Sequence, residues 1–70
     1  MSKYILIERT DKYPFVIGDR VEILQNNSVY ASNGDIGTIV TIDYGASIVH
    51  VDNKPCIGNR VLNHNLKLIS

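Results

Sequence analysis

Alternating apolar and polar residues are the main pattern along this 70-residue chain. The clearest stretches are residues 20–24, 36–43 and 47–52, in which Val or Ile recurs at alternate positions. A period of two is typical of a strand that turns one face toward a core. We therefore expect β-strands in these three stretches. In the second stretch, the alternation places Val40 and Ile42 on the same face.

Turn-forming residues separate these stretches and mark shorter elements. Asn33-Gly34 and Tyr44-Gly45-Ala46 are typical of tight turns, because Asn and Gly tolerate a positive φ. Residues 25–35 form one polar loop in this interpretation. Asn63-His64-Asn65 is expected to form one turn of 3-10 helix, followed by a short closing strand at residues 66–69.

The balance of residue types favours an all-β fold. Ile occurs ten times and Val seven, whereas Ala occurs only twice, and branched side chains fit a pleated sheet well. Five to six short strands that curl upon themselves expose few long edges. We expect residues 15–70 to form one small barrel with one 3-10 turn. Residues 1–14 are expected to be an N-terminal extension, with a strand at residues 4–8.

Four glycine-bounded or branched stretches carry a resemblance to a known group of folds. They read Gly18-Asp19-Arg20-Val21-Glu22-Ile23-Leu24, Gly34-Asp35-Ile36-Gly37-Thr38-Ile39-Val40-Thr41-Ile42-Asp43, Ser47-Ile48-Val49-His50-Val51 and Leu66-Lys67-Leu68-Ile69. Over residues 16–69 they resemble the SH3-like small β-barrels. Two branches look most similar. One is the KOW-motif domains of ribosomal proteins and transcription elongation factors. The other is the electron-transport accessory group, which includes photosystem I subunit IV and the variable chain of ferredoxin–thioredoxin reductase.

Each branch implies a different role. The resemblance to KOW domains rests on Gly37 followed by alternating apolar residues, and it implies binding to RNA or to the transcription machinery. The resemblance to the accessory group rests on matches at Gly18, Val21, Ile23, Leu24, Gly37, Thr38, Val40 and Asp43. It implies a small non-catalytic subunit that docks on a larger protein complex. Glu22 stands where those subunits often carry a basic residue.

Charge and cysteine content narrow the candidate functions. Seven Lys and Arg balance seven Asp and Glu, whereas domains that hold phosphates usually have a basic excess. Zero net charge gives little repulsion between copies, so it is compatible with a homo-oligomer. Cys56 is the only cysteine, which excludes an intrachain disulfide and fits a reducing, cytoplasmic setting. The apolar run at residues 4–7 is too short for a signal-peptide core or a membrane span.

No residue pattern points to catalysis, a metal site or a cofactor. Cys56 with His64 or His50 has the residue types of a nucleophile–base pair, but no local signature of such a pair surrounds them. His50 and Asp52 share a face of an expected strand, yet a structural zinc site needs four well-spaced ligands. We therefore expect a protein that is not an enzyme and that holds no cofactor or metal.

The residues expected to bind a partner lie mainly in loops. Tyr30, Asn33 and Asp35 belong to the polar loop, Tyr44 to the hairpin tip, and Arg60 is expected nearby. A tyrosine offers a flat apolar ring with a polar end, which suits contact with a peptide or with a nucleic-acid base. The alternative interpretation is that the tyrosines pack as a lid over a small core.

Two functions remain as hypotheses. The first, favoured by the neutral charge, is a non-catalytic protein-binding module that acts as an accessory subunit or regulator on a larger complex. The alternative is a KOW-type RNA-binding domain, whose phosphate contacts would come from Arg20, Lys54, Arg60 and Lys67. In either case the N-terminal strand would cover a barrel edge of its own chain or pair with another chain.

Overall fold

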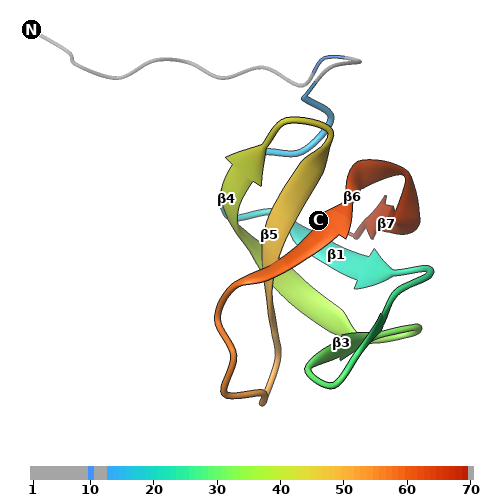
Figure 1. Cartoon of the computed structure of the whole chain (residues 1–70). Coiled ribbons are helices and arrows are strands. Elements are labelled where there is room, and N and C mark those ends of the chain that lie inside the picture. Colours follow the sequence, from blue (N-terminus) through green and yellow to red (C-terminus); the bar gives the residue numbers. More distant parts are fainter. Residues whose placement is uncertain (1–9, 11–12, 70) are drawn as a thin grey trace, which may run out of the picture.

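A five-stranded antiparallel sheet and a two-stranded ladder make up the fold (Figure 1). The computed structural model describes residues 10 and 13–69. The sheet has the order β6-β5-β4-β1-β7, with β1 (Arg20–Ile23), β4 (Ile36–Asp43), β5 (Ala46–Val51), β6 (Asn59–Leu62) and β7 (Leu66–Leu68). The ladder pairs β2 (Asn27–Ser28) with β3 (Ala31–Ser32), and the 3-10 turn η1 (Asn63–Asn65) joins β6 to β7. Among these residues no helix is long and apolar enough to cross a membrane.

The all-β prediction and its main elements are confirmed. The three alternating stretches form β1, β4 and β5, the two residues Tyr44 and Gly45 make the hairpin turn, and Asn63–Asn65 form the expected 3-10 turn. The polar loop at residues 25–35 contains the β2–β3 ladder, which the sequence did not predict. The strand expected at residues 4–8 lies outside the described residues.

The sheet is curled, and its two edges converge at η1. Within the described part of the chain, no ladder joins β6 to β7, so no sheet closes into a barrel. The three residues of η1 nevertheless cover only about 6 Å, and they connect the end of one edge strand to the start of the other. The end of β6 and the start of β7 must therefore lie close together.

A bulge interrupts the alternation in β4. The register between β4 and β5 shifts between Ile39 and Thr41, so one extra residue lies on β4. Ile39 is fully buried, whereas Val40 and Thr41 are both exposed and Ile42 packs against the core. The expectation that Val40 and Ile42 share a face is therefore wrong. The extra residue of the bulge shifts the alternation by one position in the second half of β4.

The core lies inside the curl of the sheet. Its buried apolar residues are Phe15, Val21, Ile23, Ala31, Ile39, Val49, Val51, Val61 and Leu66. Phe15 comes from the segment before β1 and Ala31 from β3, so elements outside the sheet also cover this core. Burying Ala31 fixes the β2–β3 ladder against the core, and this contact positions one side of the candidate site.

Candidate functional site

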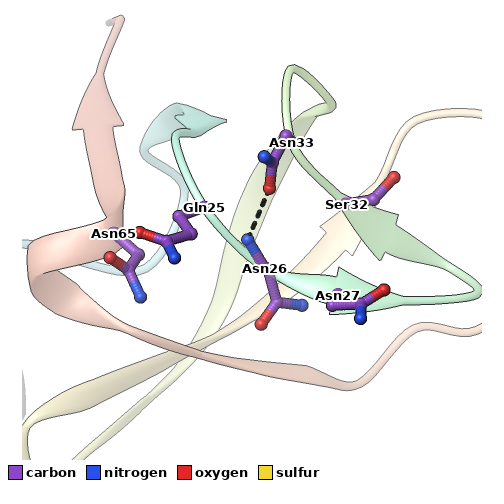
Figure 2. Close-up of a pocket in the computed structure, with 6 residues that line it drawn as sticks. All are labelled: Gln25, Asn26, Asn27, Ser32, Asn33 and Asn65. Carbon is purple, nitrogen blue, oxygen red and sulfur yellow. Dashed lines mark hydrogen bonds between the residues drawn. The ribbon is translucent and has the colours of Figure 1, made fainter.

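An open cleft of about 650 Å³ lies between the β2–β3 ladder and η1. Its lining residues are Gln25, Asn26, Asn27, Ser32, Asn33 and Asn65, and we call it the amide cleft. Figure 2 shows that these side chains come from the chain after β1, from the ladder and its following turn, and from η1. The volume falls within the range of about 300–1,000 Å³ that is typical of ligand sites.

Hydrogen bonds fix the ladder side of the amide cleft. The main-chain N–H of Asn26 donates to Asn33 Oδ1 at 2.8 Å, and Asn26 Nδ2 donates to the Ala31 carbonyl at 2.7 Å (Figure 2 shows the first of these bonds). The main-chain N–H of Ser32 donates to Asp35 Oδ2 at 3.0 Å. Because Ala31 is fully buried, these bonds attach this side of the cleft to the core.

The other side of the amide cleft is fixed through η1. The main-chain N–H of Leu24 donates to the Asn65 carbonyl at 2.7 Å, which joins η1 to the end of β1. Ser47 on β5 donates from its hydroxyl to Asn63 Oδ1 at 2.7 Å. Since Ser47 is fully buried, this second bond holds η1 against the interior. Both sides of the cleft are therefore in place before any ligand arrives.

Three amide side chains in the cleft make no hydrogen bond within the described residues. They belong to Gln25, Asn27 and Asn65. Each amide offers one carbonyl acceptor and an NH₂ donor. None of the six lining residues carries a charge. The cleft therefore presents hydrogen-bonding groups without a net electrostatic field of its own.

Three of the five residues predicted to bind a partner lie at or beside this cleft. Asn33 lines it, and Asp35 supports the ladder through its bond from Ser32. Tyr30 lies in the turn between β2 and β3 and is 40% exposed. The loop singled out in the sequence therefore lies at the candidate cleft, and two of these residues shape the loop by accepting hydrogen bonds within it.

The other two predicted residues lie at the opposite end of β4. Tyr44 follows the last residue of that strand and is 72% exposed, and Arg60 contacts it through a bond from Nη2 to the Tyr44 carbonyl at 3.4 Å. The eight residues of β4 extend over about 25 Å, and Figure 1 shows β3 and the β4–β5 turn at opposite ends of the sheet. The five residues therefore do not form one surface.

The basic residues proposed for RNA binding mostly face carboxylates. Arg20 forms an ion pair with Asp52 and Arg60 forms one with Asp43, whereas Lys67 only lies opposite Glu22 in the register of β7 with β1. Arg20 donates to both carboxylate oxygens of Asp52, at 2.8 and 2.5 Å. Arg60 Nε lies 2.8 Å from Asp43 Oδ2. Lys54 lies in the turn after β5. Two of the four cations, Arg20 and Arg60, are thus neutralised by ion pairs in the fold.

The two aspartates of these ion pairs have a lowered pKa. The hydrogen bond from Arg20, aided by its charge, lowers the pKa of Asp52 from its ordinary value of 3.8. The hydrogen bonds from Arg60 and from the Tyr44 main chain lower the pKa of Asp43 in the same way. Both pairs are exposed to solvent, so each contributes little to stability at physiological salt.

Acid is expected to weaken the folded state through these pairs. A carboxylate whose pKa is lowered by folding stabilises the native state above its unfolded pKa of 3.8, and this contribution is lost as the pH falls through the lower folded value. We expect the melting temperature of the native protein to fall more steeply between about pH 4.5 and pH 2 than that of Asp52→Asn. Thermal unfolding followed by circular dichroism at low salt measures this. Parallel pH curves for the two proteins would contradict it.

Two of the residues weighed for metal binding, His50 and Asp52, contact other groups. His50 Nε2 lies 3.0 Å from the Lys54 carbonyl, and Asp52 is engaged by Arg20. Cys56 is a free, partly buried thiol in the β5–β6 connection. Within residues 10 and 13–69, no group of three or more His, Cys, Asp or Glu side chains is arranged to hold a metal ion.

Sequence reasoning missed most of the lining of the amide cleft. Asn33 was singled out, but Gln25, Asn26, Asn27 and Asn65 were interpreted only as loop or turn residues. Their concentration was visible as Gln25-Asn26-Asn27 and as Asn63-His64-Asn65. That these two stretches lie side by side could not be seen in the sequence. Their proximity depends on the bond between Leu24 and Asn65 and thus on the pairing of β1 with β7.

Comparison with protein-family models, with curated proteins and with solved structures finds no match to this chain.

Proposed function

We propose that this protein is a non-catalytic protein-binding module that docks on a larger complex through the amide cleft. The observation that carries the proposal is the cleft itself, which is preformed, uncharged and lined by amides and one hydroxyl. Neutral hydrogen-bonding groups suit a polypeptide, which has regular donors and acceptors and no obligatory charge. The lining includes no general base that would activate the Ser32 hydroxyl for a reaction.

The proposed role agrees with the other features of the chain. Zero net charge and the paired basic residues give little support to the alternative of RNA binding, which depends on cations that are free to contact phosphates. An SH3-like barrel remains our proposal for the fold. It is supported by the curled sheet, the polar loop after β1, the β4–β5 hairpin and the 3-10 turn before the closing strand.

Site-specific photocrosslinking tests the function and its location. A benzoylphenylalanine at position 27 is expected to form a covalent adduct with one defined protein in an extract of the source cells. Asn27 is exposed and its side chain makes no hydrogen bond within the described residues, so the fold should tolerate this change. The same group at position 41, on the exposed outer face of β4, should form no such adduct.

A third position distinguishes the cleft from the hairpin. The same photoreactive group at position 44 replaces one exposed aromatic side chain with another. Adducts only from position 44 would move the binding surface to the β4–β5 hairpin and contradict the cleft. Absence of adducts from all three positions would contradict a protein-binding role.

A further inference from the structure

We propose that the amide cleft binds an extended, uncharged segment of the partner and recognises its main chain. This inference rests on the proposed function and specifies the chemistry of the partner. The three unbonded amides of Gln25, Asn27 and Asn65 carry it, together with the free edge of β2 beside them.

The first argument is chemical complementarity. A side-chain amide carries a C=O acceptor and N–H donors, so an Asn or Gln can exchange two hydrogen bonds with the N–H and C=O of one extended residue, which point to the same side. An extended main chain repeats such units every 3.3 Å or so. The three unbonded amides come from two places along the chain, residues 25–27 and η1, and they line one cleft. They can therefore contact successive peptide groups of a segment that passes through it.

The second argument is the cost of a mismatched ligand. A hydrogen-bonding group that loses water without gaining a partner weakens binding, because its desolvation is not compensated. An apolar ligand would leave the unbonded amides of Gln25, Asn27 and Asn65 in that state. A charged ligand would lose water without meeting an opposite charge in the lining. A neutral main chain avoids both penalties.

The third argument is the position of β2. In the described part of the chain, Asn27–Ser28 pair only with β3, so the other edge of β2 has no strand beside it. Asn27 also lines the cleft. The cleft thus adjoins a short strand whose free edge can accept an added strand. The side-chain amides and the strand edge would then both hydrogen-bond the main-chain N–H and C=O groups of the bound segment.

Two other ligand classes fit less well. Proline-rich segments dock in grooves lined by aromatic rings, and no aromatic residue lines this cleft. Proline also lacks the N–H that the amides would accept. Single-stranded RNA requires cations and stacking rings, and the six lining residues supply neither. An extended peptide with intact main-chain N–H groups is therefore the ligand that the lining favours.

Nuclear magnetic resonance of the full-length ¹⁵N-labelled protein provides the test, because side-chain NH₂ groups of Asn and Gln give their own signals. The probe is a capped, uncharged hexapeptide of alternating Thr and Val, titrated to millimolar concentration. We expect the side-chain signals of Gln25, Asn27 and Asn65 to shift together. The dissociation constant should change less than twofold between about 50 and 500 mM NaCl, because no ion pair forms.

A peptide methylated at alternate main-chain nitrogens is the matched control, since it keeps every side chain and loses N–H donors. It should bind at least tenfold more weakly. Asn27→Leu, which removes one amide at similar volume, should also weaken binding of the unmethylated peptide. Thr41→Val on the outer face of β4 should not. Amide spectra of each variant confirm that the fold is kept.

The outcomes separate this inference from the proposed function. Equal binding of the methylated and unmethylated peptides would overturn main-chain recognition. Absence of any shift in the three side-chain signals would overturn it too. In both cases position 27 could still crosslink a folded partner protein. Shifts of the same three side chains by a single-stranded oligoadenylate, with none by the peptide, would overturn the inference in favour of a nucleic acid. Absence of crosslinking at positions 27, 41 and 44 would overturn the proposed function itself.

Discussion

Gly37→Ala is expected to destabilise the protein by about 3 kcal/mol, at the upper end of the usual cost of overpacking. A Cβ at position 37 would lie 2.6 Å from the His50 carbonyl oxygen and 2.7 Å from Val49 Cγ1. The first of these atoms belongs to the backbone of β5 and cannot rotate away. Gly37 lies in the middle of the sheet, opposite Val21 on β1 and Val51 on β5. The strands would therefore have to separate where the sheet curls.

The chain provides a matched control for this substitution. A Cβ at Gly58 would meet only Ile48 Cγ2, at an ordinary 3.7 Å. Gly58→Ala should be neutral, or stabilising by about 0.4–1 kcal/mol through the unfolded state. Urea denaturation of the three proteins measures the difference. If the two alanine variants unfolded within about 1 kcal/mol of each other, Gly37 would not be the point of close strand approach that the structure describes.

Ile39→Ala should lower the free energy of unfolding by a similar amount, about 3–4 kcal/mol, because it leaves a cavity where Gly37→Ala overfills the sheet. Ile39 is one of the largest fully buried side chains, and alanine would leave a cavity in a core of few residues. The total stability of a chain this long is about 4–10 kcal/mol. The variant is therefore expected to be close to unfolding at 37 °C. Thermal unfolding followed by circular dichroism would show this as a much lower melting temperature.

The neighbouring residue tests the bulge at the same time. Val40 is 37% exposed because the register shift turns it outward. Val40→Ala should cost about 1 kcal/mol or less, which is typical of a partly exposed site. Comparable losses at positions 39 and 40 would mean that both side chains are buried, and that the extra residue of β4 lies elsewhere.

The strands could be predicted from the sequence because each depends on local signals. Alternation identified β1, β4 and β5, and the glycine after Tyr44 identified the hairpin, where Gly45 has a φ of 73°. The bulge in β4 could not be predicted in this way. Its position is set by how β5 aligns with β4, and the residues 39–41 look like regular alternation.

The candidate site was predictable only in part, because it depends on contacts between distant residues. Asn33 and Asp35 lie in the loop that the sequence singled out. Asn65 joins that loop only through the pairing of β7 with β1. The ion pairs could not be predicted for the same reason. Arg20 and Asp52 are far apart in the sequence and form a two-bond ion pair in the fold.

The attachment of η1 makes the complete cleft depend on a contact between distant parts of the chain. β7 must pair with β1, its partner near the beginning of the described chain, and such distant closure is slow because most of the intervening chain has to be ordered first. Gln25 and Asn65 meet only once this closure is made. On the function proposed above, a partly folded chain would lack the complete cleft, so binding of a partner would report that folding is finished.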